Sequence, residues 1–228
     1  LRSNEMGEAK KVALIHALEE SKQPVWKSFY DLWPEAVLSN YSDLSLSKDR
    51  NLGQNENTIS QRISNLAKMA VSENADAILY TCSAFGDEIN RVKDQYSIPI
   101  LRPNEAAFID AIQLKQKIKI MVTFLPSLEL LTQEIKTMMV ESNTELEVEG
   151  IYVKEALNSL QNGLVNQHDD LIAKIALDQT DDCTIILGQF SMASALSNIS
   201  EKNPDLRVLT TPDSSVLRLK KIIEAKLV

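Results

Sequence analysis

The feature that most constrains this chain is an internal repeat. The segment KVALIHAL, which contains His16, has the same pattern of residue types as IKIMVTFL, which contains Thr123. AILYTC, which ends at Cys82, resembles TIILGQ, which ends at Gln189, and both pairs are offset by 107 residues (123 − 16 and 189 − 82). A third pair, LRPNEAAF and TTPDSSVL, is offset by 109 residues (212 − 103). Three matches in the same order predict a duplicated structural unit.

Each copy of the repeat alternates short apolar runs with longer segments of helical periodicity. Strands that are nearly all apolar and are separated by helices are typical of parallel sheets covered on both faces. We therefore predict an α/β fold of two lobes, each with a four-stranded parallel sheet. The predicted strands span residues 12–17, 37–40, 77–82, 98–101, 118–124, 146–153, 184–189 and 208–211. The polar stretch 39–57 is predicted to be an irregular loop that lies over a site.

The repeat also predicts where a ligand binds. Ligands of open parallel sheets bind beyond the carboxyl ends of the strands, where loops and helix N-termini converge. His16, Cys82, Thr123 and Gln189 all stand at such ends. If the lobes face each other, Cys82 and Gln189 approach a ligand from opposite sides, so the predicted site is the interlobe cleft.

Cys82 and His16 are the candidate catalytic residues. Cys82 leaves a strand and enters a helix, whose N-terminus favours a thiolate, although a buried structural cysteine has the same sequence signature. In a sheet of flavodoxin order, His16 lies beside Cys82 and can accept the thiol proton or act as a separate acid, unless it is a satisfied structural histidine. Cys183, at a strand entrance, and His168, at a helix start, are expected to be structural.

Composition excludes several functions. The formal net charge of −8 is unsuited to nucleic acid, and no apolar run approaches the ~20 residues that span a bilayer. The six glycines are not clustered, so no G-x-G-x-x-G or P-loop is present, and the two histidines and two cysteines lack paired metal-ligand spacing. Residues 1–10 lack a secretory h-region, although they are compatible with a trimmed or engineered leader. These features predict a cytoplasmic protein without a metal site or a membrane association.

The block YTCSAFG around Cys82 resembles the aspartate/glutamate racemase superfamily, which includes hydantoin racemases, maleate isomerases and arylmalonate decarboxylase. The resemblance continues through LRPNEA, TFLPS, GQFSM and TPDS in the order of the family. It implies two pseudo-symmetric flavodoxin-like lobes, with the active site in the interlobe cleft, and commonly a homodimer. It also implies helices that cross between the lobes, so that residues 1–104 plus 212–228 form the first lobe and residues 105–211 the second.

Racemases of this family need no pyridoxal phosphate or other cofactor, because two cysteines, one from each lobe, act on opposite faces of the substrate. Cys82 matches the cysteine of the first lobe. The chain departs from the pattern at Gln189, whose amide does not exchange a proton near neutral pH. The other expected substrate contacts at the strand ends are small hydroxyl residues and their neighbours. The substrate-binding set is Ser83, Ala84, Thr123, Phe124, Gln189, Phe190, Ser191 and Thr211.

Three functions remain open at this point. The first is a cofactor-independent racemase or isomerase of a small carboxylate, either an amino acid or a related α-acidic compound. In it, Cys82 is one acid/base and His16 or water is the other. The second is a lyase similar to arylmalonate decarboxylase, in which Cys82 protonates one face of an enolate-like intermediate. The third is a relative that binds a small carboxylate without turning it over.

Overall fold

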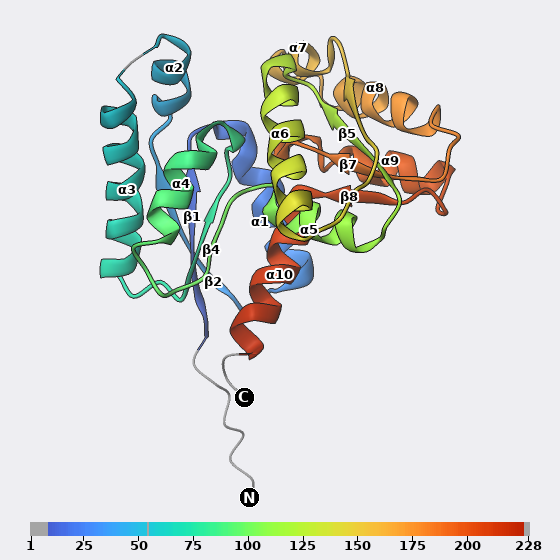
Figure 1. Cartoon of the computed structure of the whole chain (residues 1–228). Helices are drawn as coiled ribbons and strands as arrows, with labels where there is room; N and C mark the ends of the chain where they lie inside the picture. The colour runs from blue at the N-terminus through green and yellow to red at the C-terminus, as the bar shows by residue number, and fades with distance from the viewer. Residues whose placement is uncertain (1–8, 54, 226–228) are drawn as a thin grey trace, which may run out of the picture.

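The computed structural model describes residues 9–53 and 55–225, so most of the predicted leader, residues 1–8, lies outside the described residues. Two four-stranded sheets lie side by side, each with helices around it (Figure 1). Every strand pair in both sheets is parallel. The predicted α/β architecture of two parallel four-stranded sheets is confirmed.

The strand order is the same in both sheets, β2-β1-β3-β4 in the first and β6-β5-β7-β8 in the second. This is the flavodoxin-like order, in which the second strand of each unit lies at the edge. All eight predicted strands occur, with ends that differ by up to two residues. Their bounds are β1 Lys11–His16, β2 Val37–Ser42, β3 Ala77–Tyr80, β4 Ile100–Leu101, β5 Lys117–Val122, β6 Val148–Tyr152, β7 Cys183–Leu187 and β8 Val208–Thr210.

Ten α-helices and three short 3₁₀ helices connect the described strands. The α-helices are α1 Lys22–Leu32, α2 Leu46–Asn51, α3 Glu56–Ser72, α4 Gly86–Lys93, α5 Glu105–Gln113, α6 Leu125–Glu141, α7 Ala156–Gln161, α8 Val165–Leu177, α9 Ala195–Lys202 and α10 Thr211–Ala225. The 3₁₀ helices are η1 Glu19–Ser21, η2 Ser83–Phe85 and η3 Phe190–Met192. None of the described helices has both the length and the apolar character that a bilayer crossing requires.

The inner strands form the core of each lobe, because helices cover both of their faces. Every residue of β3 and β7 is buried, whereas the edge strands β2 and β6 are largely half-exposed. Gly188, directly after β7, is needed for close packing: a Cβ there would lie 2.9 Å from the carbonyl oxygen of Met121 in β5. The chain therefore leaves β7 pressed against the end of β5.

The helix that follows the last strand of each lobe packs on the sheet of the other lobe. Phe108 of α5 belongs to the same buried cluster as Ile120 of β5, in the second sheet. Leu219 of α10 belongs to the same cluster as Leu14 of β1, in the first sheet. In Figure 1 α10 accordingly runs from the second lobe toward α1, which it contacts. The two lobes are thus joined by helices exchanged between them.

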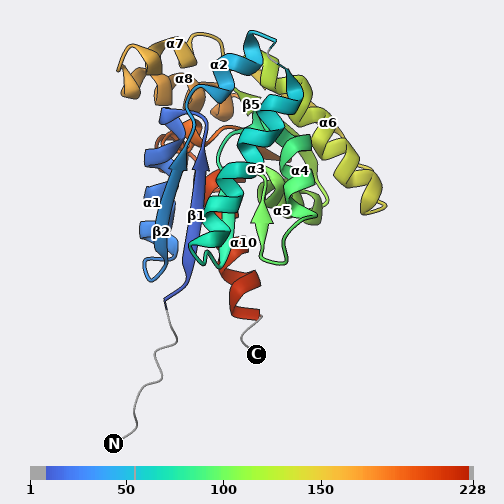
Figure 2. The ribbon, with the colours of Figure 1, turned by 90° about the vertical axis from the view of Figure 1, so that its left-hand side faces the viewer.

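The prediction of an irregular loop over residues 39–57 is wrong in part. Strand β2 continues to Ser42, α2 spans Leu46–Asn51 and α3 begins at Glu56. Leu46 is 1% exposed and lies in the core cluster that also contains Cys82 and Ile63. The local sequence is polar, so tertiary contacts rather than hydrophobic periodicity form this helix. In Figures 1 and 2, α2 and α7 lie at the same end of the molecule.

Candidate active site

The candidate site lies where the lobes meet at the carboxyl ends of their inner strands. The element that follows Cys82, η2, contacts α6, which follows Thr123 in the other lobe. The element that follows Gln189, η3, contacts η1, which follows His16 in the first lobe. These two crossed contacts relate the lobes by the same pseudo-symmetry as the sequence repeat. They bring the neighbourhoods of all four predicted strand-end residues to the interlobe boundary.

Cys82 is 8% exposed, and its Sγ lies 3.8 Å from the hydroxyl oxygen of Ser47 in α2. Burial raises the pKa of the Cys82 thiol, while hydrogen bonds from the Ala84 backbone and from Ser47 lower it in part. The expectation that a helix N-terminus makes this thiolate easier to form is therefore wrong for this state. The reason is that Cys82 precedes only the three-residue η2, and desolvation outweighs the few donors around it.

Arg50, also in α2, is a positively charged side chain that acts on Cys82. It lowers the pKa of the thiol by Coulombic attraction, although burial has the larger and opposite effect. Its guanidinium carbon lies 5.1 Å from the centre of the Phe85 ring, and it forms an ion pair with the buried Glu88. Ser47 and Arg50 were not predicted from sequence, because both fall in the stretch 39–57, which carries no helical apolar pattern.

His16 is fully buried at the end of β1, and β1 and β3 are neighbours as predicted. Its Nδ1 lies 3.0 Å from Thr81 Oγ1 and 3.4 Å from Ser21 Oγ, and its Nε2 lies 3.0 Å from Asn40 Oδ1. Burial lowers the pKa of His16, which favours the neutral ring. Within the described residues, the imidazole bonds to this hydroxyl and amide network, and it reaches Cys82 only through Thr81, the preceding residue.

Gln189 is tied to Thr123 across the ends of β7 and β5. Its Oε1 accepts hydrogen bonds from the Thr123 backbone N–H at 2.6 Å and from the Thr123 hydroxyl at 2.9 Å. Thr123 is 2% exposed, whereas Gln189 is half-buried. Among the described residues no acceptor bonds to the amide Nε2 of Gln189, so its two N–H donors remain available. The second lobe therefore presents a fixed amide where the first lobe presents a thiol.

The remaining predicted contacts divide into accessible and enclosed residues. Ser83, Ala84 and Ser191 are half-buried in η2 and η3, and Phe124 is 38% exposed after β5. Phe190 is 3% exposed and belongs to a core cluster of the first lobe, where it packs across the lobe boundary. Thr211 is fully buried, and its hydroxyl donates to the carbonyl of Leu187. The first group is accessible to solvent and its contact with a ligand stays a prediction, whereas the second group serves packing.

Cys183 and His168 lie away from the strand ends of the site. Cys183 begins β7, is 3% exposed and belongs to the core of the second lobe, as predicted. His168 is fully buried in the first turns of α8, where its Nδ1 lies 2.8 Å from Asp169 Oδ1. Across residues 9–53 and 55–225, no group of three or more His, Cys, Asp or Glu side chains is arranged to hold a metal ion.

Solved structures of racemases have the same overall fold. A glutamate racemase isoform from Bacillus anthracis superposes with a TM-score of 0.70 at 13% identity, over 96% of this chain and 84% of that one. An aspartate racemase homologue from Pyrococcus horikoshii OT3 gives 0.67 at 16% identity, over 94% and 99% of the two chains. Allantoin racemase from Klebsiella pneumoniae gives 0.66 at 11% identity, over 95% and 89%.

Comparisons of the whole sequence do not detect these likenesses. No protein-family model matches the sequence, and no curated protein sequence does so either. At identities of 11% to 16%, the structural matches establish the fold and leave the chemistry to be argued from the residues of this chain. The chain has the same two-lobed fold as these glutamate, aspartate and allantoin racemase structures.

Proposed function

We propose that this chain is a cofactor-independent racemase or isomerase that acts on a small carboxylate by proton transfer through Cys82. The substrate is an amino acid or a related α-acidic compound. The observation that supports this most is the environment of the thiol. Cys82 follows the fully buried strand β3, and its Sγ lies 3.8 Å from Ser47 Oγ. The positive charge of Arg50 lowers the pKa of the thiol, against the larger effect of burial. Racemases of glutamate and allantoin with the same fold make this chemistry the natural one to test.

In the proposed reaction, the Cys82 thiolate takes the α-proton of the substrate. The electron pair of the C–H bond enters the adjacent carboxyl or carbonyl group, which gives an enolate-like intermediate. A proton then returns to the same carbon, either from the Cys82 thiol on one face or from a water molecule on the other, in which case the hydroxide that is left takes the proton from the Cys82 thiol. Burial raises the pKa of the thiol, so the thiolate, once formed, is a stronger base toward a weakly acidic proton.

The residues around the thiol have supporting roles in this proposal. Ser47 donates its hydroxyl hydrogen to the carbonyl of Ala17 at 3.3 Å, and on ionisation of Cys82 it can turn that hydrogen toward the sulfur. Hydrogen-bond donors of the second lobe, the amide N–H groups of Gln189 above all, would hold the oxygen atoms on which negative charge develops. His16 has a positioning role here, because it fixes Thr81 beside Cys82.

A second candidate, a lyase, is favoured by one specific observation. The second lobe has an amide held by Thr123 where a second acid or base would be needed for direct inversion. In a decarboxylation, the bond between the α-carbon and one carboxylate breaks, carbon dioxide leaves, and the electron pair stays on the α-carbon. The Cys82 thiol then donates its proton to that carbon. Only one acid is required, and Gln189 would bind the carboxylate that remains.

The proposal is tested by isotope exchange in heavy water. The protein is incubated with a panel of enantiopure amino acids, other α-acidic carboxylates and substituted malonates. Loss of the α-hydrogen signal is followed by NMR, configuration by chiral chromatography, and carbon dioxide release separately. We expect deuterium to enter the α-position of at least one compound, with slow inversion compared with exchange. Carbon dioxide release with single deuterium incorporation would select the lyase.

The matched control for this test compares the two cysteines. Cys82→Ser should lower exchange by at least about a thousandfold, because a hydroxyl is a far weaker acid than a thiol, while the melting temperature stays close to that of the wild type. Cys183→Ala should retain the exchange activity, since Cys183 lies in the core of the second lobe. Full activity in Cys82→Ser, or ligand binding without exchange in the wild type, would refute a catalytic role for Cys82.

A further inference from the structure

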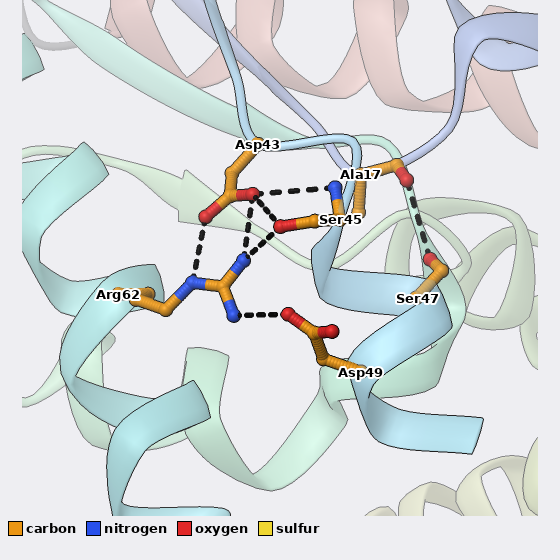
Figure 3. Close-up of polar contacts among 6 residues, drawn as sticks. All are labelled: Ala17, Asp43, Ser45, Ser47, Asp49 and Arg62. Carbon is orange, nitrogen blue, oxygen red and sulfur yellow. Dashed lines mark hydrogen bonds and ion pairs between the residues drawn. The ribbon is translucent and has the colours of Figure 1, made fainter. Parts of the chain in front are cut away.

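Helix α2 is too short and too polar to be stable by itself. It has six residues, Leu46–Asn51, and only Leu46 is buried. Helices of this length are marginal in water even when their sequences favour helix, so contacts with the rest of the protein must fix its position. Figure 3 shows that a single side chain from the neighbouring helix α3 supplies many of these contacts.

That side chain is Arg62. Its Nε and Nη2 donate to the two carboxylate oxygens of Asp43, both at 2.7 Å, and its Nη1 donates to Asp49 at 2.6 Å (Figure 3). Nη2 also donates to the hydroxyl of Ser45, which itself donates to Asp43 at 2.8 Å. Asp43 follows β2 and Asp49 lies within α2. The guanidinium therefore ties α2 to the end of the sheet and to α3 at once.

The three charged side chains are partly shielded from water. Side-chain exposure is 25% for Arg62, 26% for Asp43 and 19% for Asp49. The bond from Arg62 is the main cause that lowers the pKa of Asp43, which keeps that carboxylate ionised. Bidentate contacts between arginine and a carboxylate are among the strong and directional hydrogen bonds of proteins. This geometry fixes an orientation of α2, beyond adding charge attraction.

The orientation matters because of what α2 holds against Cys82. Ser47 contacts Sγ, and Arg50 extends over Phe85 to Glu88 of α4. With α2 in this position Cys82 is only 8% exposed. Arg62 itself bonds to Asp43, Ser45 and Asp49, and it acts on the thiol only through the helix that these residues hold.

We propose that Arg62 is a positioning residue of the Cys82 site, which holds α2 closed over the thiol through Asp43 and Asp49. The inference rests on the proposed function for the role of the thiol, but the closure itself is independent of turnover. Releasing Arg62 frees α2 to move away, which uncovers Cys82 and withdraws Ser47 and Arg50 from it. The thiol then becomes more reactive toward a small reagent while it loses its partners.

The test measures alkylation of each cysteine in the full chain by iodoacetamide, read for each site by mass spectrometry. In Arg62→Met we expect Cys82 to react at least about tenfold faster than in the wild type, because local opening exposes it. Cys183 is the internal control, since it lies in the second lobe at 3% exposure and reacts faster only if the whole protein opens. Lys117→Met is the matched variant, because Lys117 begins β5 in the second lobe and pairs there with Glu147, Glu149 and Asp181.

Two further variants keep the inference testable if Arg62→Met is poorly folded. Asp49→Asn removes only the contact inside α2 and should accelerate Cys82 alkylation by a smaller factor, about threefold. Arg62→Lys keeps the positive charge but cannot form the bidentate contact with Asp43, and it should give a rate between those of the wild type and Arg62→Met.

Several outcomes would overturn the inference. One is an unchanged Cys82 rate in both Arg62→Met and Asp49→Asn. Another is an equal acceleration of Cys82 and Cys183, and a third is the same acceleration in Lys117→Met. None of these results bears on whether Cys82→Ser abolishes exchange, so the two proposals fail separately.

Discussion

The two lobes have the same strand order but different chemistry where their strands end. In the first lobe, Cys82 is a titratable thiol covered by α2, which Arg62 holds in place. In the second lobe, the equivalent position is the amide of Gln189, tied to Thr123. Position 169, which lies 107 residues after Arg62, is Asp169, and it pairs with His168 and Ser194 instead of with the neighbouring helix α7.

This difference shows that equivalent strand-end positions in the two lobes hold residues with different chemical roles. One lobe provides the group that can give or take a proton, and the other provides fixed hydrogen-bond donors. The same difference holds for His16 and Thr123, which also occupy equivalent positions. His16 supports the thiol side through Thr81, whereas Thr123 orients the amide. The following predictions test this division of labour, in order of decreasing effect.

The largest effect is expected from loss of the hydrogen bonds that His16 forms in the first lobe. His16→Phe fills the ring volume but removes three hydrogen-bond contacts, with Thr81, Ser21 and Asn40. Because the partners are left buried without the ring, we expect the free energy of unfolding to fall by about 3 kcal/mol. Urea denaturation followed by circular dichroism measures it. The control is His168→Phe in the second lobe, which removes one contact and should cost about 1 kcal/mol.

The same histidine predicts a pH dependence of stability. Burial lowers the pKa of His16 below its ordinary value of 6.5, so on acidification the unfolded chain binds a proton before the folded chain does. Lowering the pH from about 7.5 to about 5.0 should therefore destabilise the wild type, and the contribution of His16 should be absent in His16→Phe. Urea midpoints at the two pH values measure this. An equal change of the urea midpoint between the two pH values in both proteins would exclude His16 as a source of the pH dependence.

A second thiol should make the two lobes chemically more alike. In Gln189→Cys, the second lobe gains a group that can exchange a proton, as in the two-cysteine pattern of the racemases that the sequence resembles. We expect the ratio of inversion to α-deuterium exchange to rise about tenfold, which corresponds to about 1.4 kcal/mol in relative barrier height. Gln189→Ser, which adds no thiol, is the control. Inversion that stays at the wild-type ratio would mean that the two strand ends do not act on one substrate.

The smallest effect is expected in the orientation of the amide. Thr123→Val removes the hydroxyl that donates to Gln189 at 2.9 Å but leaves the backbone donor at 2.6 Å. Since one of two hydrogen bonds remains, we expect a loss of about 1 kcal/mol in the free energy of unfolding and a several-fold lower exchange rate. Thr123→Ser, which keeps the hydroxyl, should behave like the wild type. A full loss of exchange in Thr123→Val would assign the hydroxyl a direct contact with substrate.

The fold could be predicted from the sequence because its determinants are local. Strands such as β3 and β7 are apolar along their whole length, and the repeat of these runs gave both the number of strands and their grouping in two sheets. The carboxyl-end rule for parallel sheets then selected Cys82 and Gln189 without any knowledge of side-chain contacts. The elements that follow the two residues contact the opposite lobe, and a common ligand for Cys82 and Gln189 stays a prediction.

The details of the site could not be predicted, because they depend on tertiary contacts. Helix α2 has little apolar periodicity, and the ion pairs of Arg62 with Asp43 and Asp49 join different elements, 19 and 13 residues apart along the chain. The sign of the pKa shift of Cys82 depends on how completely neighbouring segments exclude water from it. A helix N-terminus read from sequence gives one contribution to that shift and says nothing of the desolvation that outweighs it.

The exchange of α5 and α10 between the lobes has a consequence for how the chain is made. Val216, Leu219 and Ile223 of α10 pack with β1 and α1, which are translated some two hundred residues earlier. During synthesis, part of the apolar surface of the first sheet therefore stays uncovered until residues 211–225 have left the ribosome. A nascent chain of this protein therefore exposes this apolar surface to solvent for most of its translation.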